Sequence, residues 1–187
     1  YQHLMDYWAN SMQDDFYLIA DHGWNAEVTR IVERDKKGKE KDKGWVCDLI
    51  PKEFVVSSYL HTEKKDLEAQ MAELESVTSK LAEIEEEHGA EDGVLSDLEK
   101  INKANVAARY KEIKSDATLK EETQILSQWL SLAEKEAELK KKVKEVESDL
   151  DEKALKQYAK LKEADVKTLV VEAKWLATIK KAIDEEM

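Results

Sequence analysis

Apolar side chains recur every seven residues in two separate stretches, and this repeat constrains the fold more than any other feature. Such a repeat forms the seam of a coiled coil, the stripe of side chains that faces a partner helix. The first seam comprises Leu60, Leu67, Leu74, Val77, Leu81 and Ile84, and the second comprises Ile125, Trp129, Leu132, Leu139, Val143, Val146 and Leu150. Glu63, Gln70 and Glu136 are the polar exceptions within them.

The two seams match in length, at about 25 residues each, or ~37 Å along a helix at about 1.5 Å per residue. Neither helix could bury its stripe alone, and antiparallel pairing of the two covers both stripes at once. The intervening insert, about residues 89–118, then forms the tip of the hairpin. Apolar residues at roughly helical spacing predict that the tip contains a helix of its own.

The composition agrees with long helices. Charged residues make up 39% of the chain, while only 5 Gly and 1 Pro are available for turns. A profile rich in Ala, Glu, Lys and Leu is typical of long helices and coiled coils. The apolar fraction of 42% suffices for a narrow seam and small end clusters, and it is too high to indicate disorder.

The first 51 residues differ in composition from the rest of the chain, because they are rich in aromatic residues and hold three of the five Gly. The short apolar run Phe16–Ala20, bounded by polar residues, predicts a buried strand. Val28–Glu33 and Trp45–Ile50 flank the polar stretch Arg34–Gly44 and predict a β-hairpin, with Gly38 in its turn. A small β-containing base segment is therefore expected over residues 1–51.

The helical arm is expected over residues 52–150, because Pro51 can end the sheet and precede the first turn of a helix. The heptad period breaks after Leu150, so residues 151–187 are expected to form short helices that pack back on the base, near Trp24 and Trp45. The predicted fold class is mainly α: a long antiparallel coiled-coil helical hairpin with a helical tip, on a small α+β base.

Charge and cysteine content narrow the class of protein. A net charge of -12 argues against the whole chain wrapping nucleic acid, although a local basic contact stays open. The single Cys47 cannot form an internal disulfide and fits a reducing compartment. No apolar run approaches the ~20 residues that span a bilayer, and no signal peptide is recognisable. Because the chain opens on Tyr1 within a patterned segment, we expect a cytoplasmic piece of a longer protein with no membrane contact.

Catalytic and metal motifs are missing from the sequence, which predicts no catalytic and no metal-binding residues. Asp14-Asp15 is the only acidic pair beside a predicted strand, and the favoured interpretation is the end of a helix and the start of a strand. Cys47 is expected to be a small buried side chain. The histidines show no ligand spacing and are interpreted as solvated or capping residues: His3, His22, His61 and His88.

A locally basic stretch interrupts this acidic chain. Lys36, Lys37, Lys39 and Lys41 lie in the predicted hairpin loop and could contact a phosphate backbone. Acidic residues are interspersed among them, so a solvated loop is the favoured interpretation.

Three segments carry a resemblance to a known family: Tyr7–Ile19, Leu49–Val56 and Lys167–Leu176. They are similar to the C-terminal portion of the modification (methyltransferase) subunit of type I restriction–modification systems, in its longer form. The acidic Glu86–Gly89, followed by Asp92-Gly93, resembles the same family's arm tip. The likeness runs over essentially the whole chain, and its motifs are structural rather than catalytic.

The resemblance implies a parent enzyme that transfers a methyl group from S-adenosylmethionine to the N6 of adenine in duplex DNA. In that family two modification subunits join one specificity subunit, and a restriction subunit can join them. The family's catalytic motif is Asn-Pro-Pro-Phe or Asn-Pro-Pro-Tyr, and a Gly-rich loop holds the cofactor. Neither occurs here, since the only Pro is Pro51, after Ile50. No catalytic or cofactor-binding residue is therefore expected in this chain.

The expected function is a non-catalytic assembly and positioning module that contacts the specificity subunit. Two alternatives stay open: a module that contacts DNA through the basic loop 36–41, and a purely structural arm whose seams are consumed by each other.

Overall fold

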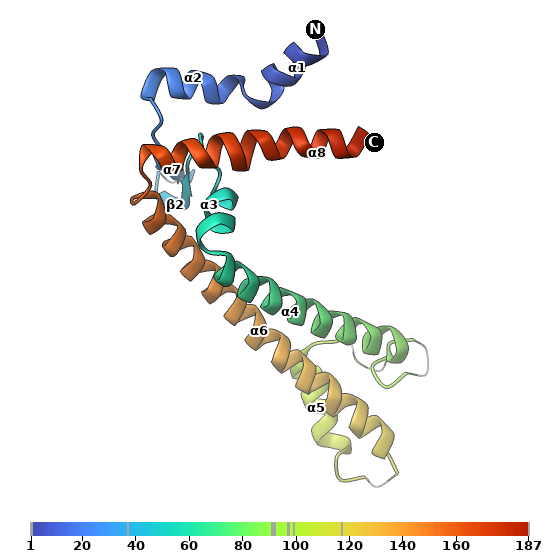
Figure 1. Cartoon of the computed structure of the whole chain (residues 1–187). Helices are drawn as coiled ribbons and strands as arrows, with labels where there is room; N and C mark the ends of the chain where they lie inside the picture. The colour runs from blue at the N-terminus through green and yellow to red at the C-terminus, as the bar shows by residue number, and fades with distance from the viewer. Residues whose placement is uncertain are drawn as a thin grey trace. The chain divides into compact units, whose positions relative to one another are not determined.

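The computed structural model describes residues 2–36, 38–90, 93–96, 98, 100–116 and 118–186. The fold is mainly α, with a long helix pair and a small two-stranded antiparallel sheet near the N-terminus, which confirms the predicted fold class (Figure 1). The chain divides into two compact units. Unit 1 comprises Tyr1–Lys64 and Asp149–Met187, and unit 2 comprises Lys65–Ser148.

Unit 1 begins with two helices, α1 (Gln2–Ser11) and α2 (Gln13–His22). The strand predicted at Phe16–Ala20 is wrong, because these residues lie inside α2. A short apolar run fits a strand or a helix equally well by periodicity. The covered side chains of α2 include Asp15, Leu18 and Ile19, at the i, i+3, i+4 spacing of one helical face.

The hairpin is present, with a shorter loop than expected. Strand β1 (Thr29–Arg34) pairs antiparallel with β2 (Glu40–Val46). The sequence predicts the second strand at Trp45–Ile50, but the strand starts earlier. Glu40 already lies opposite Arg34, and Lys41 lies opposite Glu33. Gly38 takes a positive φ of 75° in the turn, as expected, and its N–H donates to the Asp35 carbonyl at 2.7 Å.

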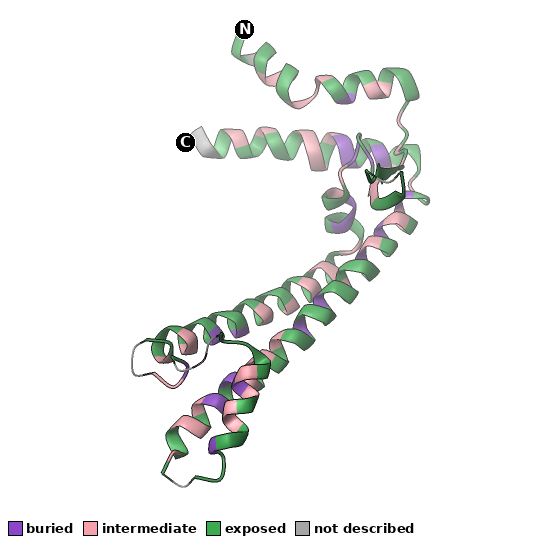
Figure 2. Ribbon diagram, turned by 180° about the vertical axis from the view of Figure 1, so that it is seen from behind, coloured by how far each residue is buried: buried purple, intermediate pink, exposed green. Residues whose placement is uncertain are grey.

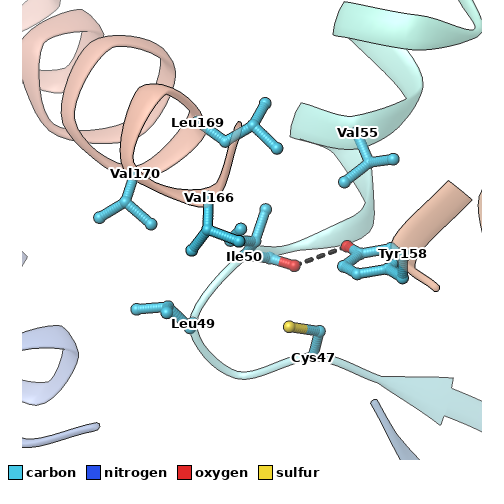
Figure 3. Packing of buried hydrophobic residues seen from close by; sticks show 8 residues of the cluster. All are labelled: Cys47, Leu49, Ile50, Val55, Tyr158, Val166, Leu169 and Val170. Carbon is cyan, nitrogen blue, oxygen red and sulfur yellow. Dashed lines mark hydrogen bonds between the residues drawn. The ribbon is translucent and has the colours of Figure 1, made fainter. Parts of the chain in front are cut away.

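The rest of unit 1 is helical. Helix α3 (Lys52–Tyr59) follows Pro51, and α7 (Glu163–Thr168), the π-helix η1 (Leu169–Leu176) and α8 (Ala177–Glu186) run consecutively at the end of the chain. The buried core joins α3, α7 and η1 to the segment after β2 (Figure 3). It comprises Cys47, Leu49, Ile50, Val55, Tyr158, Val166, Leu169 and Val170. Trp24 and Trp45 pack against this core, which includes residues of α7 and η1.

Two long helices complete the chain, α4 (His61–His88) and α6 (Lys120–Tyr158), with α5 (Lys103–Ile113) between them in sequence. The separate short helix expected directly after Leu150 is wrong, because α6 continues without interruption to Tyr158. Leu150, Ala154 and Tyr158 are all buried at a spacing of four, so only the apolar period changes. Since alanine is small, its place on the buried face is easily missed in a sequence.

Tyr158 is the polar anchor of the unit 1 core. Its hydroxyl donates to the Ile50 carbonyl at 2.6 Å, and its ring meets Trp45 edge-on at 5.2 Å between centroids. Burial raises the pKa of Tyr158 well above its ordinary value of 10.0. The neutral phenol is therefore the form that the folded core holds.

Removing this hydroxyl should weaken unit 1 and change its response to alkali. Tyr158→Phe leaves the Ile50 carbonyl without its donor, which we expect to cost about 1–3 kcal/mol at neutral pH. Because the folded state raises the pKa, the stabilisation is fully present below pH 10.0 and is lost as the pH rises beyond it. Urea unfolding between neutral pH and strong alkali measures both effects. The wild-type chain should lose more stability over that range than Tyr158→Phe, and equal losses would contradict this account.

Candidate partner-binding surfaces

The helix pair of unit 2 is antiparallel. Residues that ascend along α4 contact residues that descend along α6, and the two helices run side by side in both views (Figures 1 and 2). The polar contacts that join them are Glu73–Lys135 at 2.7 Å, Thr78–Glu136 at 3.1 Å and Glu85–Trp129 at 3.0 Å. Trp129 and Glu136 are seam positions of α6, whereas Glu73, Thr78 and Glu85 lie beside the seam of α4.

All predicted seam residues are at least half-buried. The buried ones are Val77, Leu81, Trp129, Leu139, Val143 and Leu150, and the half-buried ones are Leu60, Leu67, Leu74, Ile84, Ile125, Leu132 and Val146. Leu60 and Leu150 lie in unit 1, and the others lie in unit 2. Burial is thus deepest on α6, while α4 keeps much of its seam partly accessible.

Glu136 is a polar seam residue with two partners. Its carboxylate accepts a hydrogen bond from the Thr78 hydroxyl on α4 and forms an ion pair with Lys140 at 2.9 Å. The hydrogen bond from Lys140 lowers the pKa of Glu136, partial burial opposes the change, and Thr78 adds to it. The side chain therefore stays ionised inside the seam and links the two helices.

The insert covers the far end of the pair, and it buries a residue that the heptad analysis missed. Leu126 is 0% exposed and shares a cluster with Leu95, Val106 and Ile113 of the insert. It follows Ile125 directly, so it lies about 100° around the helix from the predicted seam position. The sequence does contain a signal for this contact: Leu126 is apolar and directly follows the seam residue Ile125. Two consecutive residues cannot both face the same partner helix.

Helix α4 carries an apolar strip that its partner covers incompletely. Leu67 and Leu74 are half-buried, and Met71 between them is 48% exposed. Met71 lies four residues after Leu67 and three before Leu74, so the three share one side of the helix. Gln70 lies beside them, and its buried Oε1 has no hydrogen-bond partner. We call Leu67, Gln70, Met71 and Leu74 the α4 strip.

A buried ion pair in unit 1 was not predicted. Asp15 on α2 is 5% exposed and is the buried charged side chain among the described residues. Its carboxylate receives the Lys174 ammonium at 2.7 Å and the Trp175 indole N–H at 2.8 Å, both from the π-helix η1. Lys174 also donates to the Leu49 carbonyl at 3.0 Å. The Phe16 ring stacks on Trp175 at 5.1 Å, beside this node. The Asp15 node therefore fastens α2 to η1.

The boundary between a helix and a strand that the sequence predicts at Asp14-Asp15 is wrong. Both residues instead lie in the first turn of α2, where acidic side chains favour a helix. Asp14 is exposed, whereas Asp15 points into the protein. The contacts of Asp15 with Lys174 and Trp175, which lie 159 and 160 residues away in sequence, distinguish the two.

Two of the described histidines contact a neighbouring acid. His22 contacts Asp21 at 3.3 Å and His88 contacts Glu87 at 3.9 Å, each with its sequence neighbour. Within the described part of the chain, no group of three or more His, Cys, Asp or Glu side chains is placed to hold a metal ion. Cys47 is buried after β2 rather than within a strand, and burial raises the pKa of its thiol. The thiol is therefore protonated and poorly nucleophilic.

The basic residues of interest lie on the hairpin. Lys36 and Lys39 flank the turn, Lys41 lies in β2, and all three are exposed. Lys37, the fourth predicted contact, lies outside the described residues.

Among the described residues, no helix is both long enough and apolar enough to cross a membrane. Comparison of the chain with models of protein families, with curated proteins and with solved structures finds no match.

Proposed function

We propose that this chain is a non-catalytic assembly and positioning module of the modification subunit of a type I restriction–modification DNA adenine methyltransferase. In this proposal it binds the specificity subunit within a cytoplasmic complex that a restriction subunit can join. The S-adenosylmethionine site and the catalytic residues belong to other parts of the parent enzyme. The resemblance of Tyr7–Ile19, Leu49–Val56 and Lys167–Leu176 to the modification subunit supports the assignment to that enzyme. The α4 strip supports the contact with the specificity subunit.

The α4 strip is the observation that carries the contact. Coiled-coil seams bind further helices when their seam side chains stay accessible, and flanking charges then set register and orientation. On α4, Leu67 and Leu74 are only half-covered by α6, and Met71 extends the same side into solvent. A helix laid along this side would cover the three apolar side chains. It could also bring a donor to the Gln70 amide after a small side-chain movement.

Co-elution tests the proposal. The purified chain, mixed with the specificity subunit, should elute with it from a size-exclusion column. Met71→Lys places a charge in the proposed contact and should weaken binding at least tenfold, which corresponds to about 1.4 kcal/mol. Met5→Lys is the matched control, because Met5 is also an exposed methionine, at 39%, and lies in unit 1.

Two results would contradict the proposal. Failure of the wild-type chain to co-elute, while the intact modification subunit succeeds, would leave the purely structural arm as the better account. Equal binding by wild type and Met71→Lys, with unchanged helix content by circular dichroism, would remove the α4 strip from the contact.

A further inference from the structure

The β-hairpin of unit 1 exposes nearly all of its side chains. Every residue of β1 is exposed, and so are most of β2 (Figure 2). Pairing of the two strands accounts for the backbone hydrogen bonds but leaves both faces of the ribbon uncovered. A ribbon of this kind contributes little to a core, so its side chains are available for a partner.

Alternation along the strands sorts the hairpin's charges onto two faces. One face is neutral, because its arginines and acids pair across the strands: Arg30 with Asp42, and Arg34 with Glu40 at 2.9 Å. The register places Val32 on this face as well, opposite Asp42.

The other face carries the lysines. Lys39, Lys41 and Lys43 alternate along the chain, and Glu33 lies directly opposite Lys41. The ion pair of Lys43 with Glu33 at 2.9 Å places Lys43 on the same face as Glu33 and Lys41. Lys36, at the turn, lines one hollow with these three lysines, and Glu33, Arg34, Asp35 and Glu40 line it as well.

The described part of the hairpin has more basic than acidic side chains, and three of its acids are in ion pairs. Glu33, Glu40 and Asp42 form the ion pairs above, and the Asp35 carboxylate accepts the backbone N–H of Lys36 at 2.6 Å. Within the described residues, the side chains of Lys36, Lys39 and Lys41 have no carboxylate partner. Their charges are therefore free for an external anion, although the chain as a whole carries -12.

Side-chain contacts at the base of the hairpin attach it to the rest of unit 1. Trp45 packs edge-on against Tyr158 at 5.2 Å, and its indole N–H donates to the Asp151 carboxylate at 2.7 Å. Lys52 forms an ion pair with the same carboxylate. The base therefore holds the lysine face in a defined orientation with respect to the rest of unit 1.

We infer that the lysine face of this hairpin binds the phosphate backbone of a nucleic acid through Lys36, Lys39 and Lys41. Lys39 directly precedes β2, Lys41 lies two residues further along the chain, or about 7 Å at about 3.4 Å per residue, and Lys36 lies in the turn. A row of ammonium groups suits the repeated charges of a phosphodiester chain better than a single anion. Such contacts carry no base specificity and depend on counterion release. The contact is separate from the proposed binding of the specificity subunit.

Fluorescence anisotropy with a labelled DNA duplex of arbitrary sequence, at low ionic strength, tests the inference. The full chain should bind weakly, and the logarithm of its association constant should fall with the logarithm of salt at a slope of about -3 for three contacts. Replacing Lys36, Lys39 and Lys41 with Gln should weaken binding at least tenfold and flatten the slope by about one per lysine.

The matched control replaces Lys111, Lys114 and Lys144 with Gln, which are exposed lysines of unit 2. Both triple variants change the net charge by the same amount, so only a local contact distinguishes them. The same assay with a single strand shows whether duplex geometry contributes. No binding by the wild-type chain, or equal loss in both variants, would overturn the inference. Equal binding to polyglutamate would reassign the face to acidic protein partners.

Discussion

Asp15→Ala is expected to cost unit 1 about 3–5 kcal/mol of its free energy of unfolding, the largest effect of any substitution considered for this chain. The reason is the partner that the substitution leaves behind. Lys174 is only 18% exposed, and without Asp15 its ammonium group keeps one carbonyl partner and no counterion. The Trp175 indole N–H loses its acceptor at the same time.

Urea unfolding followed by tryptophan fluorescence measures this loss, because unit 1 holds Trp8, Trp24, Trp45 and Trp175. Asp14→Ala is the control, since Asp14 is the exposed neighbour in the same helical turn, and it should change stability by less than about 0.5 kcal/mol.

A double variant separates the buried charge from the shape of the site. Asp15→Leu with Lys174→Met removes both charges and should recover much of the loss, since replacing a whole buried pair with apolar groups is often neutral. A cost for Asp15→Ala as small as that for Asp14→Ala would show that α2 is not held by this node.

Leu126→Ala is expected to destabilise unit 2 by about 2–5 kcal/mol, whereas Ile125→Ala should cost clearly less. Leu126 is 0% exposed within the cluster that joins α6 to the insert, so its truncation leaves a cavity. Ile125 is half-buried, and solvent can occupy part of the space that its truncation opens.

Circular dichroism during thermal unfolding compares the two variants directly. They are matched in the number of side-chain atoms removed and in sequence position, so intrinsic helix propensity contributes almost equally. Equal destabilisation, or a larger loss for Ile125→Ala, would mean that the predicted seam rather than the insert controls the stability of this end.

The sequence predicts helices and their buried sides best where one apolar repeat continues over many helical turns. The seams on α4 and α6 lie at least half-buried along their length, because a seven-residue repeat can serve only one side of a helix. Short segments gave less information. Phe16–Ala20 is too brief to separate a strand from a helix, and the true start of β2 falls in a run of charged residues that no hydrophobic pattern marks.

The candidate binding surfaces were also predicted only in part from the sequence. The sequence shows that four lysines lie close together in the basic loop. It does not show which of them form ion pairs with the nearby acidic residues. The contacts between the strands decide that, because they pair Arg30 with Asp42 and Arg34 with Glu40 and leave Lys36, Lys39 and Lys41 exposed. The family resemblance, the partners and the function stay predictions.

By itself the sequence determined that this chain forms a long helix pair with a small sheet near its start, since period and composition act locally along the chain. Only the tertiary structure decided how deep the seams are buried and where α6 ends. It also decided which member of Asp14-Asp15 is buried, because that choice depends on Lys174 and Trp175, which lie far away in sequence. The physical reason is that burial and charge pairing are properties of neighbours in space, whereas a repeat records only neighbours along the helix.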